Sequence, residues 1–138
     1  MDRLILTDKL ESLRRCVARV ETRRAASVEE LARDPDRQDI LSLNLTRAVQ
    51  LCVDIALHVL AARGEPVPRT MGESFDRLAE LGIISEPVRQ GMRAAVGFRN
   101  IAVHSYRAID WAIVHGITLD RLDDFRAFAA AMDGLLED

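Results

Sequence analysis

The side chains best suited to chemistry lie together in the run GFRNIAVHSY, which holds Arg99, Asn100, His104 and Tyr106. An arginine offers a permanent positive charge and a planar pair of N–H donors that match a phosphate. A histidine can take up or release a proton near neutral pH. Packing of a helix does not need these groups, because a buried polar group must find a partner. The run therefore predicts a site for phosphate chemistry.

Helix geometry limits how these groups can act together. Asn100 and His104 are four residues apart and are expected to share one face, whereas Arg99 and Tyr106, seven apart, are expected to share another. Arg99 and His104 are about 140° apart around the axis and about 7–8 Å apart along it. Either the long arginine reaches around the helix, or two copies of the helix face each other and build one site. The second arrangement predicts a two-fold homodimer.

The elements that must position this run are all expected to be helices, because alternating β-branched runs are absent and helix formers dominate. Four long helices are predicted: residues 2–24, residues 36–63, a helix capped by Ser85 that carries the motif, and one capped by Thr118. Short helices are expected after Ser27 and Thr70, each of which begins a capping box. The predicted fold class is all-α, an antiparallel bundle of four long helices and one or two short ones, in a single domain spanning residues 1–138.

Apolar residues spaced by three and four predict the core side of each long helix. These stripes are Leu6, Leu10, Leu13, Val17 and Val20; Leu41, Leu45, Ala48, Cys52, Ile55 and Val59; and Leu119, Leu122, Phe125, Phe128, Ala129 and Met132. Cys16 and Cys52 fall within these segments without metal-binding spacing, so both are expected to be buried thiols.

Composition excludes several classes of protein. The 138 residues are 49% hydrophobic, which excludes a disordered chain. The sequence lacks an uninterrupted apolar run long enough for a membrane span, and its start does not resemble a signal peptide, so a cytoplasmic protein without membrane contact is expected. The net charge of −3 argues against a general polyanion binder. Any affinity for nucleic acid must therefore come from a local group of arginines.

Several further residues are candidates for supporting roles. Asp54 and His58 are four apart on one helix face, and they are interpreted as a hydrogen-bonded pair or as support for the site. A metal pair there lacks a third ligand, so no metal site is predicted. Arg93 and Arg107, with Arg89, are further positive charges near the motif. An arginine group near the start of the chain is expected to be a solvated face or a partner surface: Arg14, Arg15, Arg19, Arg23 and Arg24.

The spacing R-x4-H-x-Y, formed by Arg99, His104 and Tyr106, resembles the motif of HEPN-domain proteins. More specifically, the chain resembles the HepT-like branch, RNase toxins that act with a minimal nucleotidyltransferase antitoxin. The runs LCVDIALH (51–58) and ESFDRLAE (73–80) are also similar to blocks of that branch. The resemblance extends over nearly the whole chain and implies the same helical fold.

What the resemblance implies is a metal-independent endoribonuclease toxin of a type VII-like toxin–antitoxin pair, acting on RNA such as tRNA. His104 would move a proton to or from the reacting oxygens. Arg99 would stabilise charge on the phosphate, and Asn100 would fix the imidazole or bind the substrate. Arg93, Arg89 and Arg107 would contact the RNA backbone nearby, with Asp54 and His58 as candidate supports of the site. No cofactor is expected on this chain.

The same resemblance implies that Tyr106 receives AMP from the nucleotidyltransferase antitoxin, which would itself use ATP and Mg²⁺. The charged adduct would then compete for the pocket that holds the RNA phosphate. A different class of function also fits the sequence, a non-catalytic HEPN subunit that binds a nucleotidyltransferase and shapes its nucleotide or substrate site. The presence of all of Arg99, His104 and Tyr106 favours the ribonuclease.

Overall fold

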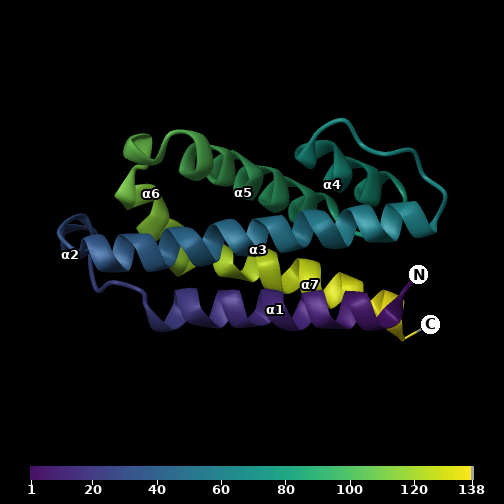
Figure 1. The fold of residues 1–138 in the computed structure, drawn as a ribbon, viewed down its shortest axis with the longest axis horizontal. Helices are drawn as coiled ribbons and strands as arrows, with labels where there is room; N and C mark the ends of the chain where they lie inside the picture. The colour runs from purple at the N-terminus through teal and green to yellow at the C-terminus, as the bar shows by residue number, and fades with distance from the viewer. Residues whose placement is uncertain (138) are drawn as a thin grey trace.

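The computed structural model describes residues 1–137, and these form helices and connecting turns without a strand. Three long helices, α1 (Arg3–Thr22), α3 (Pro35–Ala62) and α5 (Glu86–His104), are followed by a fourth long helical segment. That segment joins α6 (Trp111–Gly116), η2 (Ile117–Arg121) and α7 (Leu122–Leu136). The four segments alternate in direction, so the two ends of the chain lie at the same end of the bundle (Figure 1). The predicted all-α antiparallel bundle is confirmed.

Short elements connect the long ones where the sequence predicts them. The helix α2 (Val28–Ala32) follows α1, and α4 (Met71–Glu80) follows α3. The turn η1 (Tyr106–Ala108) follows α5. Ser27, Thr70 and Ser85 each accept a hydrogen bond from a backbone N–H in the first turn of the next helix, as predicted. Gly64 and Gly82 end their helices at a φ of 74°, a left-handed conformation that glycine adopts without strain.

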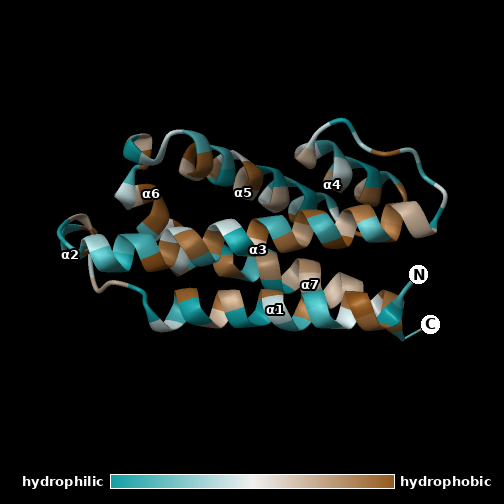
Figure 2. Ribbon diagram, viewed as in Figure 1, coloured by the Kyte–Doolittle hydropathy of each residue, from teal (hydrophilic) through white to brown (hydrophobic). Residues whose placement is uncertain are grey.

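The helix α3 is the centre of the bundle, with α1, α4, α5 and α7 all packed against it. Apolar and polar segments alternate along every long helix, as expected where one side of the helix is buried (Figure 2). On α3, 12 of the 28 residues are buried, and they point in several directions. Any site that uses α3 must therefore use the outward-facing stripe that remains, which includes Asp39, Leu43 and Arg47.

The core contains the predicted apolar stripes with one exception. All the stripe residues of α1 and α3 are buried, and both cysteines are buried free thiols. The rings of Phe75 and Phe128 meet edge to face with centroids 5.6 Å apart, which joins α4 to α7. Leu119 was expected in the core but is 52% exposed, because η2 changes the helical register ahead of α7.

Thr118 does not cap a helix, contrary to the sequence prediction. The helix that begins at Trp111 continues through Gly116 and a π-turn into α7. The Thr118 hydroxyl is buried and donates a 2.6 Å hydrogen bond to the carbonyl of His115. The His115 ring, in the last turn of α6, lies half-buried with Nε2 at 3.2 Å from the carbonyl oxygen of Ala25. A threonine satisfied within its own helix leaves no reason for the chain to stop there.

By length and composition, α3 is apolar enough to cross a membrane. Half of its most apolar window is buried among the other helices, and the central helix of a bundle meets the same criterion. The feature is thus weak evidence for a membrane span.

Replacement of Phe128 by alanine tests the core. The side chain is fully buried, so Phe128→Ala is expected to lower the free energy of unfolding by about 3–5 kcal/mol. Chemical denaturation followed by circular dichroism measures the change. Ile113→Ala serves as control, because Ile113 is 60% exposed and its loss is expected to change stability by less than about 0.5 kcal/mol. Equal effects of the two variants would contradict this account of the core.

Candidate functional site

Arg99 lies one turn before the end of α5 and is half-buried. Its Nη1 donates a 3.2 Å hydrogen bond to Oδ1 of Asn100, whereas its Nε is buried without a hydrogen-bond partner. A buried donor without a partner is unfavourable by about 1–3 kcal/mol. The Nε–H group of Arg99 thus has no acceptor among the described residues of the single chain.

His104 is the last residue of α5 and its side chain is exposed. The helix ends because Ser105 leaves helical geometry, with φ −148° and ψ 55°, while its N–H still bonds to the carbonyl of Ile101. The next residues form the separate turn η1. Arg99 and Tyr106 therefore do not share a helix face, contrary to the prediction from a single continuous helix.

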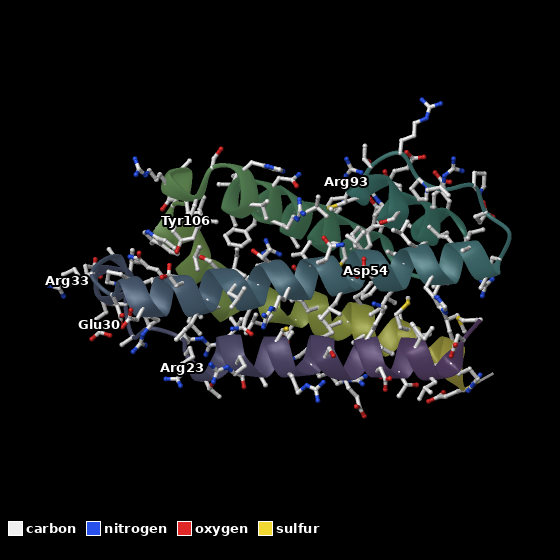
Figure 3. The ribbon with its side chains drawn as sticks, viewed as in Figure 1. Arg23, Glu30, Arg33, Asp54, Arg93 and Tyr106 are labelled. Atoms are coloured by element: carbon white, nitrogen blue, oxygen red, sulfur yellow. The ribbon has the colours of Figure 1, made fainter. Side chains whose placement is uncertain are left out.

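Tyr106 turns back across the bundle to α3 (Figure 3). Its hydroxyl donates a 2.5 Å hydrogen bond to Oδ1 of Asp39 near the start of α3. Its ring meets Trp111 edge to face with centroids 6.0 Å apart. Partial burial, and then the hydrogen bond to Asp39, raise the pKa of the Tyr106 phenol above its ordinary value. The hydroxyl is thus held protonated and oriented, while the side chain stays 40% exposed.

The remaining motif contacts differ from those expected. The carbonyl oxygen of Asn100 accepts a hydrogen bond from the Arg99 guanidinium and not from the His104 imidazole, and its binding of substrate stays a prediction. Among the described residues no hydrogen bond joins Arg99 to His104. The single chain therefore carries both groups on the last turns of α5 without closing them into one hydrogen-bonded unit.

The arginines expected to follow an RNA backbone from α5 are partly neutralised. Asp76 on α4 bonds to Arg93 at 2.7 Å and to Arg89 at 2.9 Å, and Arg89 also pairs with Glu86. Figure 3 shows Arg93 beside α4. These ion pairs would compete with a phosphate for Arg93 and Arg89. Arg107, in η1, is exposed and without an ion pair among the described residues.

Asp54 and His58 contact α1 rather than the motif or each other. Asp54 accepts a 2.9 Å hydrogen bond from Gln50 and lies 3.7 Å from the Lys9 ammonium. His58 accepts a 3.2 Å hydrogen bond at Nε2 from the backbone N–H of Asp2. The predicted hydrogen bond between Asp54 and His58 is therefore not formed among the described residues, and their support of the site stays a prediction. Within residues 1–137 no group of three or more potential metal ligands comes together.

Asp39 is the site residue that the sequence did not indicate. It is 67 positions from Tyr106 and stands in the acidic opening of a helix, beside Asp34 and Asp36. Carboxylates in a first turn are usual because they complement the helix dipole. The sequence offered no signal to separate Asp39 from these neighbours.

One groove of the described chain does not include the motif side chains. Its volume is about 700 Å³, and it lies between α5 and the C-terminal helical segment. Phe98 and Ile101 of α5 line it. Arg99, His104 and Tyr106 are not part of its lining.

Comparison with known proteins identifies the family. A family model described as ribonuclease HepT-like matches residues 9–132, which is most of the chain. The chain belongs to the HepT-like ribonuclease family. The mRNA nuclease HepT of Shewanella oneidensis is 32% identical to this HepT-like chain over 124 residues, covering 90% of this chain and 92% of that protein. The resemblance inferred from the motif is confirmed.

Solved structures of HepT-like proteins share the same fold. A tri-AMPylated HEPN toxin of Shewanella oneidensis in complex with MNT antitoxin aligns with a TM-score of 0.88 at 29% identity, covering 97% of this chain and 98% of that one. A toxin–antitoxin complex with AMP-PNP aligns with a TM-score of 0.86 at 29% identity, covering 96% and 98%. The cytosolic protein YutE of Bacillus subtilis, at 12% identity and a TM-score of 0.86, shares the fold alone.

The buried Nε of Arg99 predicts an unusual response of stability to substitution. Arg99→Met keeps much of the side-chain volume and removes the unpartnered donor. The free energy of unfolding is expected to stay level or rise by up to about 1–3 kcal/mol. Arg37→Met is the control, because Arg37 bonds to Asp34 at 3.2 Å and to the Arg24 carbonyl at 2.9 Å. The free energy of unfolding of Arg37→Met is expected to fall by about 1–3 kcal/mol. Urea titration measures the free energy of unfolding of both variants. Greater destabilisation by Arg99→Met than by Arg37→Met would show that Arg99 serves the fold.

Proposed function

We propose that this chain is a metal-independent endoribonuclease toxin that acts in the cytoplasm and is controlled by a nucleotidyltransferase antitoxin. The observation that carries the proposal is the half-buried Arg99 whose Nε has no partner, one turn before the exposed His104. The family match and the relative named as an mRNA nuclease support the same activity.

In the proposed reaction, the RNA supplies its own nucleophile. The ribose 2′-oxygen attacks the adjacent phosphorus, the bond from phosphorus to the 5′-oxygen breaks, and the products are a 2′,3′-cyclic phosphate and a 5′-hydroxyl. His104 removes the proton of the 2′-hydroxyl or donates one to the leaving oxygen. Arg99 balances the charge that develops on the phosphate oxygens. Because the nucleophile belongs to the substrate, this chain needs no bound metal to generate one.

A two-fold homodimer would complete the site. In one chain, no hydrogen bond among the described residues connects Arg99 with His104. Two facing copies of the end of α5 would place a guanidinium of one chain near an imidazole of the other and would offer two imidazoles for the two proton transfers. The apolar side chain of Val103, within the motif and 48% exposed, suits such a contact.

Substitution of the two central residues tests the ribonuclease activity. Purified Arg99→Ala and His104→Ala are each expected to cleave labelled cellular RNA about 100-fold or more slowly than the parent chain, because each removes a transition-state interaction. Arg63→Ala, at the exposed far end of α3, is the control and keeps full activity. Cleavage by the parent chain is expected to persist in EDTA. Equal cleavage by all variants would favour the non-catalytic subunit, whereas loss of cleavage in EDTA alone would refute the metal-free chemistry.

Tyr106 is the proposed point of control, and Asp39 is its proposed proton acceptor. The Tyr106 oxygen would attack the α-phosphorus of ATP held by the antitoxin, the bond to the β-phosphate oxygen would break, and pyrophosphate would leave. The phenol proton would pass to the Asp39 carboxylate, which already receives that hydrogen bond at 2.5 Å. The new phosphodiester would be repelled by Asp39 and attracted toward Arg99 and Arg107, where it would occupy the place of the RNA phosphate.

Substitution of Asp39 tests this control step. Asp39→Asn keeps the shape of the side chain but cannot take the proton at neutral pH, so AMP transfer to Tyr106 is expected to slow by about 100-fold. The measurement is a time course of intact mass for toxin mixed with its antitoxin and ATP. Asp36→Asn, an exposed carboxylate on the first turn of α3, is the matched control, and Tyr106→Phe defines zero transfer. An unchanged rate for Asp39→Asn, with antitoxin binding intact on a sizing column, would exclude Asp39 as the proton acceptor.

A further inference from the structure

The fold separates the arginines into two groups that the sequence did not distinguish. One group is neutralised by carboxylates at 4 Å or less: Arg14, Arg37, Arg77, Arg89, Arg93 and Arg126. This group contains the α5 arginines expected to hold RNA. Of the arginines expected to contact the RNA backbone, only Arg107 has no ion pair among the described residues, so a further positively charged surface would add to the binding of phosphates next to the scissile bond.

A groove between α1 and α3 provides that surface. Its volume is about 550 Å³, and Arg15, Arg19 and Arg47 line it. All three side chains are exposed, and none of them forms an ion pair with a carboxylate among the described residues. Arg15 donates a 3.2 Å hydrogen bond to the Ser12 hydroxyl. The groove thus brings together two arginines from α1 and one from α3.

The one carboxylate in the groove is already engaged. Asp54 accepts a hydrogen bond from Gln50 and lies beside the Lys9 ammonium. The Asn44 amide, which also lines the groove, donates to the carbonyl of Ile40 at 2.9 Å. The three guanidinium groups therefore keep their positive charge in a chain whose net charge is −3. Such a local positive potential attracts a polyanion even though the net charge of the chain is negative.

The groove lies close to the motif along α3. Asp39, which holds Tyr106, and Arg47 are eight residues apart on this helix, or about 12 Å along its axis. The exposed Leu43 lies between them on the same stripe. An extended strand that leaves the motif along α3 would enter the groove after about two helical turns.

We propose that the α1–α3 groove, defined by Arg15, Arg19 and Arg47, binds the backbone phosphates of the RNA substrate next to the scissile bond. The inference rests on the proposed ribonuclease function. Guanidinium groups bind phosphate oxygens in pairs of hydrogen bonds. No aromatic residue lines the groove, so it lacks the platform on which unpaired bases stack. The groove therefore recognises the backbone and carries no preference for base sequence.

A charge-matched pair of triple variants tests the groove. Arg15→Gln, Arg19→Gln and Arg47→Gln are combined in one chain, and the control combines Arg33→Gln, Arg63→Gln and Arg69→Gln, exposed arginines outside the groove. Both carry His104→Ala so that bound RNA is not cut. Fluorescence anisotropy with a labelled single-stranded RNA measures Kd over a series of salt concentrations.

The groove variant is expected to bind about 10-fold or more weakly than the control at low salt. Its slope of log K against log salt is expected to fall by about 2, because each lost phosphate contact removes about 0.7 from the slope for single strands. A triple Arg→Lys variant of the same positions keeps the slope. Equal Kd values and slopes for groove variant and control overturn the proposal.

Two further outcomes keep this inference separate from the proposed function. If the groove variant binds RNA normally but no longer assembles with a second copy or with the antitoxin, measured by light scattering on a sizing column, the groove is a protein interface and the proposal fails. Failure of the parent chain to cleave RNA refutes the ribonuclease, whatever the binding result. Cleavage by the parent chain together with unchanged binding by the groove variant refutes the groove alone.

Discussion

The burial of α3 is the constraint on which the rest of the structure depends. Five other helices pack against it, so its apolar side chains are covered in several directions. The residues outside the core form an outward-facing stripe that carries polar side chains. Asp39 and Arg47 both stand on that stripe, which is why one helix serves both the tyrosine of the motif and the arginine groove. The central helix of the core is thus also the helix along which the site is laid out.

The end of α5 gives the motif its shape. A helix that continued past His104 would have kept Tyr106 on the same cylinder as Arg99. Because Ser105 leaves helical geometry, the tyrosine turns toward α3 and its hydroxyl reaches Asp39. The guanidinium, the imidazole and the phenol are therefore presented from three different local structures: a helix interior, a helix end and a separate turn. This division allows modification of the phenol to affect the other two groups through charge, without unfolding of the helix.

Local sequence signals predicted most of the fold. Capping residues such as Ser27, Thr70 and Ser85 begin helices where expected, and the core stripes of α1 and α3 are buried as their spacing predicts. The errors lie at Thr118 and Tyr106, where the pattern is ambiguous. A threonine can cap a helix or bond within one, and a motif spacing does not reveal where its helix ends. In both cases the packing of the surrounding residues decides which local structure forms.

The sequence alone determined the helical class, the buried stripes and the motif residues, because periodicity, capping and motif spacing are local properties of the chain. Only the tertiary structure decided which charges remain available. Arg93 and Arg15 look alike in the sequence, yet Asp76 neutralises the first, while the second faces a groove with a guanidinium from α3. The reason is physical: a charge is neutralised by what lies within a few ångströms of it, and the partners come from helices far apart along the chain.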